Sequence, residues 1–232
     1  MPLHTYLAMT AAEYEKNPEF SASIGWMACH FSPYGTGLSN CPTDLPKGSM
    51  LIVNDRTPVC GHDPNLIAQQ LKQLVLELEC SRVLLDFQRP QEDLTVKIAE
   101  AILSAVPCPV GVSECYGAAW DGPIFLPPIP LLQSPASYLS AWHKREIWLE
   151  INQQRAHYLL SESGCQQLSF SFPAEAKSHF DRDLCCWYRM WESEDGVHFA
   201  IERNLPELKQ AAEAFAVDCL IGLYQELGSI DQ

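Results

Sequence analysis

Four acidic residues end or directly follow predicted strands, each in a different stretch of the chain. They are Asp55, Asp86, Glu114 and Glu150. Two carboxyl groups whose burial and mutual repulsion separate their pKa values can supply one protonated donor and one ionised base or stabilising charge. Strand ends are also enriched in Asp for turn formation alone, so a purely structural role for these acids stays open. If the side chains meet, the chemistry available to them is general acid–base catalysis.

The stretches that carry these acids alternate between strand and helix patterns. Buried strands are predicted by apolar runs at residues 22–31, 49–55, 82–88 and 109–116. Amphipathic helices are predicted by apolar residues at helical spacing over 65–80 and 92–106. The order strand, helix, strand, helix, strand over residues 49–116 predicts consecutive parallel strands. Because the carboxyl ends of parallel barrel strands open into one mouth, we expect the four acids to lie there.

Beyond Gly117 prolines are denser and the pattern is less regular. The elements predicted there are a strand at 124–126, a helix at 134–144, a strand at 146–152, a helix at 153–163 and strands at 166–172 and 186–192. Asp195 and Gly196 predict a hairpin turn. A last helix begins at the Asn204 cap, and its predicted apolar stripe continues to Cys219 and Leu223.

Repeated βα units favour an α/β fold, a TIM-type (β/α) barrel that is shortened or irregular, with a C-terminal hairpin and helix. Residues 1–232 are expected to form it as a single domain. An open doubly wound sheet is the alternative, but no Gly-x-Gly-x-x-Gly follows any strand and no Walker loop is present. Within residues 83–88, period two predicts that the even-numbered side chains face the barrel interior and the odd-numbered ones face helices.

The stretch Ser81-Arg-Val-Leu-Leu-Asp-Phe-Gln resembles the strand that marks family 18 glycoside hydrolases, the chitinase-like barrels, whose pattern is Asp-x-x-Asp-x-Asp-x-Glu. The resemblance covers residues 50–116. It implies that Asp86 orients the acetamido group of the substrate, which acts as nucleophile in place of a protein carboxylate. The family's proton-donating Glu is replaced by Gln88, whose amide cannot donate a proton at useful acidity.

A glycosidase-like enzyme would use Asp86 with Glu114 or Glu150, with one pair of carboxyl groups about 5 to 10 Å apart. Its predicted substrate-binding residues are Gln88, Asp55 and the sugar-stacking aromatics Trp26, Tyr34, Tyr116 and Trp120. The partner would be an oligosaccharide or another small molecule, and no cofactor is expected.

Two other functions fit the same residues. A carbohydrate-binding relative would keep Asp86 and the aromatic groove but would have lost the proton donor. A metal-dependent barrel enzyme would hold Mg²⁺ with oxygen ligands from Asp55, Asp86 and Glu114. Loss of turnover on adding a chelator would identify the metal enzyme, and glycan binding without turnover would identify the binding protein.

The amino-acid composition of the chain limits the classes of partner that it could bind. With 15 Lys and Arg against 29 Asp and Glu, the net charge of -14 disfavours nucleic acid and anionic membrane surfaces. No stretch reaches the roughly 18 apolar residues that a membrane span requires, and the first 20 residues lack the pattern of a signal peptide, so we expect a cytoplasmic location. The ten cysteines include no Cys-x-x-Cys pair, which favours reduced structural thiols over zinc ligands.

Overall fold

The computed structural model describes residues 3–16, 24–31, 37–55, 61–87, 93–114 and 120–223, with the backbone alone for 11–12, 24–31 and 223. The chain divides into two compact units. The barrel unit comprises Met1–Pro127, Lys144–Glu150 and Asp218–Gln232, and the sheet unit comprises Pro128–His143 and Ile151–Val217. A single folding domain over 1–232 stays a prediction, because compact packing does not determine whether units fold independently.

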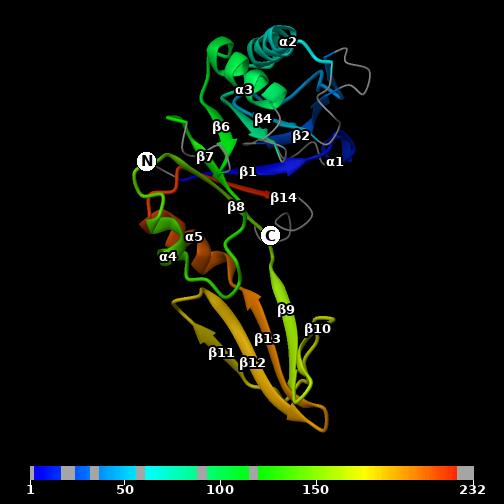
Figure 1. The fold of residues 1–232 in the computed structure, drawn as a ribbon, viewed down its shortest axis with the longest axis vertical. Helices are drawn as coiled ribbons and strands as arrows, with labels where there is room; N and C mark the ends of the chain where they lie inside the picture. The colour runs from blue at the N-terminus through cyan, green and yellow to red at the C-terminus, as the bar shows by residue number, and fades with distance from the viewer. Residues whose placement is uncertain are drawn as a thin grey trace. The chain divides into compact units, whose positions relative to one another are not determined.

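The barrel unit is built on a closed ring of parallel strands (Figure 1). In ring order they are β1 (His4–Met9), β2 (Ile24–Phe31), β4 (Met50–Asn54), β5 (Arg82–Asp86), β6 (Val110–Ser113), β7 (Ile124–Leu126), β8 (Ile147–Ile151) and β14 (Cys219–Leu223). The ring closes because β1 pairs in parallel with both β2 and β14. The short strand β3 (Leu38–Ser39) pairs antiparallel with β2. The predicted TIM-type barrel is confirmed.

Helices α2 (Pro64–Glu77) and α3 (Asp93–Ala105) pack side by side as the crossovers on either side of β5 (Figure 1). The Asp63 carboxylate accepts a hydrogen bond from the Asn65 backbone N–H at 2.9 Å, which caps α2 where Pro64 begins it. The buried face of α2 includes Ile67 and Leu71. Each such side chain contributes about 1.5 to 3 kcal/mol by burial. A short helix α1 (Ala11–Lys16) follows β1.

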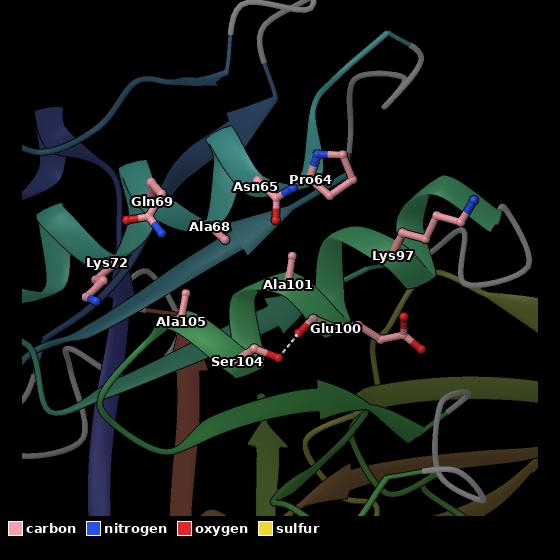
Figure 2. Close-up of a pocket in the computed structure, with 10 residues that line it drawn as sticks. All are labelled: Pro64, Asn65, Ala68, Gln69, Lys72, Lys97, Glu100, Ala101, Ser104 and Ala105. Atoms are coloured by element: carbon pink, nitrogen blue, oxygen red, sulfur yellow. Dashed lines mark hydrogen bonds between the residues drawn. The ribbon is translucent and has the colours of Figure 1, made fainter.

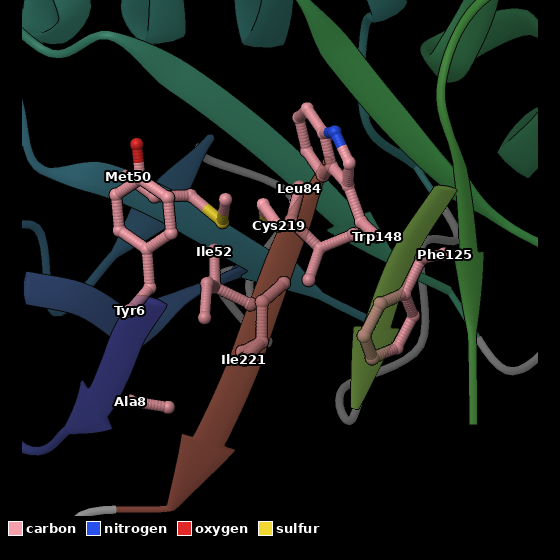
Figure 3. Packing of buried hydrophobic residues seen from close by; sticks show 9 residues of the cluster. All are labelled: Tyr6, Ala8, Met50, Ile52, Leu84, Phe125, Trp148, Cys219 and Ile221. Atoms are coloured by element: carbon pink, nitrogen blue, oxygen red, sulfur yellow. The ribbon is translucent and has the colours of Figure 1, made fainter. Parts of the chain in front are cut away.

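The barrel interior is filled by alternate side chains of its strands. Figure 3 shows Leu84 of β5 among inward side chains from β1, β4, β7, β8 and β14, which include Tyr6, Ile52 and Trp148. The predicted inward direction of the even-numbered residues of β5 is therefore confirmed at Leu84. A Cβ atom on Gly111 of β6 would lie 2.4 Å from the Trp148 ring, so only glycine lets this indole fill the interior.

The sheet unit contains a five-stranded antiparallel sheet in the order β10-β9-β13-β12-β11. Its strands are β9 (Arg155–Ser161), β10 (Gly164–Leu168), β11 (Ser178–Asp181), β12 (Cys186–Ser193) and β13 (Gly196–Arg203), and its helices are α4 (Pro135–Ser140) and α5 (Leu205–Ala214). The hairpin turn predicted at residues 195–196 joins β12 to β13. The helix predicted at 153–163 is wrong, because this stretch forms β9, and Gly164 with φ +122° makes a hairpin turn rather than a helix end.

The last helix is shorter than the sequence predicts. Asn204 caps α5 by accepting from the Glu207 backbone N–H at 3.4 Å, as expected. The helix ends at Ala214, and Ala216 has the left-handed φ of +53°. Cys219 and Leu223 consequently bound strand β14 rather than continuing the helical stripe. The C-terminal hairpin and helix are therefore followed by a strand that completes the barrel.

Candidate functional site

Asp86 is the last residue of β5, at the carboxyl end of the barrel, and it is half-buried. It lies two residues after the inward Leu84, so strand alternation directs it into the barrel mouth. Its Cα partner on the neighbouring strand is Asn54, the last residue of β4, which is only 3% exposed. An acid and an amide from adjacent strands therefore stand at the same level of the mouth.

Asn54 was missed by the sequence analysis, which considered only the acid that follows it. Period two along β4 starts from the inward Met50 and Ile52, and it continues to Asn54. This alternation is readable in the sequence, and it identifies Asn54 as an inward residue once Met50 and Ile52 are known to face the interior. The same alternation adds Ser113 of β6, two residues after the inward-facing Gly111, and its hydroxyl donates to the Leu85 carbonyl at 3.3 Å.

Glu150 reaches the same mouth from β8. It lies two residues after Trp148, which belongs to the interior cluster, and β8 runs parallel to β7 and the strands beyond it. Glu150 is half-buried and occupies the fourth of the five positions of its strand. Asp86 and Glu150 therefore lie at the same end of the barrel, each on the inward face of its strand. The distance between their carboxyl groups stays a prediction.

Asp55 and Glu114 occupy different environments from these two acids. Asp55 follows Asn54 and is only 2% exposed, and continued alternation directs it toward the helices. Glu114 follows Ser113 and is exposed to solvent. A pocket shared by all four carboxyl groups therefore stays a prediction. In the part of the chain that the structure describes, no group of three or more His, Cys, Asp or Glu side chains could hold a metal ion.

Of the four predicted sugar-stacking aromatic side chains, the structure describes one, that of Trp120. Trp120 is half-buried, and the Arg145 guanidinium donates to its carbonyl oxygen and to that of Gly122. A Cβ atom on Gly122 would lie 2.8 Å from Trp120 Nε1, so the indole lies directly over this turn. The backbone of Trp26 belongs to β2, but its side chain is outside the description. Tyr34, Gln88 and Tyr116 also lie outside the described residues.

The amino end of the barrel has a different character. Arg82 donates to the Tyr6 hydroxyl at 2.6 Å, and its guanidinium lies 6.0 Å from the centre of the Trp148 ring. Burial raises the pKa of the Cys80 thiol to about 12 and that of the Cys108 thiol to about 11. Thiols with such pKa values are protonated at neutral pH and are weak nucleophiles. These two cysteines therefore have the structural character that the sequence predicts.

A shallow groove on the helix side of the barrel unit separates α2 from α3 (Figure 2). The small side chains of Ala68 and Ala101 let the two helices approach, and Lys72 and Lys97 border the groove. It lies on the outer helices rather than at the strand ends where Asp86 stands. The mouth remains the place where inward polar groups gather.

Several solved structures share the fold of this chain at low sequence identity. The spore cortex-lytic enzyme SleL of Bacillus cereus aligns with a TM-score of 0.61 and 10% identity over 95% of this chain and 70% of that chain. A chitinase from Chromobacterium violaceum aligns with a TM-score of 0.59 and 10% identity over 95% of this chain and 93% of that chain. The SleL enzyme of Bacillus megaterium aligns with a TM-score of 0.55 and 7% identity over 94% and 70%. No protein-family model and no curated protein match the sequence.

Proposed function

We propose that the barrel mouth binds oligosaccharides that contain N-acetylated sugars, and that it hydrolyses them poorly or not at all. The observation that carries this proposal is the half-buried Asp86, which stands beside Asn54 at the carboxyl end of a parallel barrel. The likeness of the fold to a chitinase supports the choice of sugar. Because the chain shares only 10% identity with that chitinase, the ligand is inferred from the residues of the mouth.

The chemistry of these residues suits binding better than catalysis. Asp86 can accept a hydrogen bond from an acetamido N–H, and Asn54 can donate to or accept from sugar hydroxyls. A general acid must stand within hydrogen-bond reach of the glycosidic oxygen and carry a proton that it can release. Gln88, two residues after Asp86, has an amide at the position where the related pattern has the acid.

Hydrolysis with Glu150 as the proton donor is the second candidate, since this acid also faces the mouth. Magnesium chemistry has less support, because the alternation of β4 and β6 directs Asp55 and Glu114 away from Asp86. A cytoplasmic location and the exclusion of nucleic acid stay predictions. None of the described helices is long and apolar enough to cross a membrane.

The test is a titration of the full chain with N-acetylglucosamine hexamer, followed by calorimetry, with product analysis of the same mixtures. We expect binding without cleavage by the unsubstituted protein and a loss of affinity of at least 10-fold for Asp86→Asn, since a charged hydrogen bond contributes about 1.5 to 3 kcal/mol. Glu100→Gln on the outer face of α3 is the matched control. Absence of binding to the hexamer would overturn the proposal.

The variant Gln88→Glu tests the missing proton donor. Its new carboxyl is nearly isosteric with the amide, and repulsion from Asp86 should raise its pKa toward the range of a useful donor. We expect this variant to gain cleavage of the hexamer, measured by mass spectrometry of the products. Cleavage by the unsubstituted protein that is lost in Glu150→Gln would instead support the second candidate.

A further inference from the structure

Three side chains on one face of the sheet unit form a continuous hydrogen-bonded chain. Ser193 Oγ lies 2.8 Å from His198 Nε2, and His198 Nδ1 lies 2.9 Å from His157 Nε2. His157 Nδ1 lies 3.1 Å from the carbonyl oxygen of Ser169. The order of groups is hydroxyl, imidazole, imidazole, carbonyl. This is the arrangement of a nucleophile, a base and a group that orients the base.

The Ser169 carbonyl, at the end of this series of hydrogen bonds, determines which atom donates in each of them. The Ser169 oxygen can only accept, so Nδ1 of His157 carries a hydrogen and its Nε2 accepts. His198 must then donate through Nδ1, which leaves its Nε2 free of hydrogen in the neutral ring. Nε2 therefore accepts the hydroxyl proton of Ser193. The Asp195 backbone N–H donates to Ser193 Oγ at 3.1 Å, which would stabilise negative charge on this oxygen.

The surrounding sheet holds the two imidazoles in place. His157 is only 3% exposed, and His198 is half-buried on the neighbouring strand β13. The Trp191 ring stacks on His198 with centroids 4.9 Å apart and planes 5° apart, and it also contacts His157 at 5.0 Å. Ser193, at the end of β12, is exposed. The base is thus fixed and partly shielded, while the hydroxyl can meet a substrate.

We propose that Ser193 is the nucleophile of a second active site, which hydrolyses small uncharged acyl esters. Its Oγ bonds to the acyl carbon while its proton passes to His198 Nε2; the ester C–O bond then breaks, and the alcohol leaves with that proton. Water attacks the acyl-serine by the same route and releases the carboxylic acid. His157 is a positioning residue. Glu192, Glu194 and Asp195 flank Ser193 in the sequence and are exposed, and this local negative charge disfavours anionic esters.

A fluorophosphonate probe tests the nucleophile directly, because the Oγ–P bond forms only as fluoride leaves. We expect the probe to label the full chain at Ser193, located by peptide mapping, and p-nitrophenyl acetate to be hydrolysed. Ser193→Ala should abolish both signals. Ser163→Ala is the matched control, since this exposed turn hydroxyl is hydrogen-bonded to Ser161 Oγ at 2.8 Å rather than to an imidazole. Equal rates for the unsubstituted protein and Ser193→Ala would overturn the proposal.

Two further variants test the base and its positioning residue. His198→Ala should lower the labelling rate by about 100-fold or more, the usual contribution of a general base. His157→Gln keeps an acceptor for the His198 Nδ1–H, whereas His157→Leu removes it. We therefore expect faster labelling for the Gln variant than for the Leu variant. Circular dichroism checks that each variant is folded, and equal labelling of folded Gln and Leu variants would refute the positioning role.

Discussion

Arg203 is a cation that the sheet unit encloses almost completely. It is 1% exposed, and its guanidinium donates to the carbonyl oxygens of Leu184, Ile129 and Pro130. Burial lowers its pKa from the ordinary value for arginine. A buried charge costs stability unless it is hydrogen-bonded, and backbone oxygens satisfy the two terminal nitrogens of this guanidinium, whereas its buried Nε has no partner. Arg203 therefore ties the segment 129–130 and the turn at Leu184 to β13.

Arg203→Met is expected to lower the free energy of unfolding by about 1 to 3 kcal/mol for each carbonyl oxygen that loses its donor. The measurement is the urea midpoint by circular dichroism. Arg155→Met is the control, because Arg155 is exposed and its guanidinium only stacks at 5.4 Å from the Phe170 ring centre. Such a contact contributes about 0.5 to 1 kcal/mol. Similar losses for the two variants would show that the buried hydrogen bonds are not stabilising.

Single residues also mark how far sequence reasoning extends. The inward direction of Asp86 follows from period two, because β5 is a regular strand with apolar neighbours. The chain of Ser193, His198 and His157 joins β12, β13 and β9, and the sequence analysis had interpreted the last of these as a helix. A side-chain cluster that spans three strands depends on the register between them, and the periodicity of one segment does not contain that register.

At the scale of the element, β6 and β8 depend on one close contact. The Trp148 indole occupies the space beside Gly111 where any other residue would place its Cβ. Gly111→Ala should lower the free energy of unfolding by about 1 to 3 kcal/mol, as an overpacked core does. The double variant Gly111→Ala with Trp148→Phe should show less than the sum of the two single losses. Additive losses in urea denaturation would mean that the two residues are not coupled.

The elements that could be predicted are those whose pattern is local. Helices α2 and α3 and strands β4, β5 and β6 were predicted within a few residues, because apolar spacing and the Asp63-Pro64 start identify them. Strand β14 was not, since Cys219 and Leu223 are four residues apart and fit a helical stripe equally well. Its strand conformation comes from pairing with β1, which lies at the other end of the described chain.

For the whole molecule, buried thiols predict weaker stability in alkali. The pKa of Cys80 is raised by burial to about 12 from 9.0, and the pKa of Cys186 to about 11. Their contribution to stability is complete below pH 9 and is lost as the pH rises toward these folded values, because the unfolded thiols ionise first. We expect the free energy of unfolding to fall between pH 9 and pH 11.

Cys80→Ala isolates one thiol in this experiment. The slope of the free energy of unfolding against pH should become less steep by up to about 1.4 kcal/mol per pH unit. Cys165→Ala is the control, since Cys165 is exposed on β10. Urea denaturation at a series of pH values measures both slopes, and an unchanged slope in Cys80→Ala would contradict the assignment.

Because the barrel closes through the pairing of β1 with β14, it cannot close until the last of its strands has been synthesised. Strand β1 is synthesised before β14, one of its two partners, which is made only after the whole sheet unit has been translated. Until then one edge of β1 presents unpaired backbone groups, which can pair with other chains. Nascent chains that stop before residue 219 should therefore be the ones that recruit chaperones most strongly, because the ring they contain is still open.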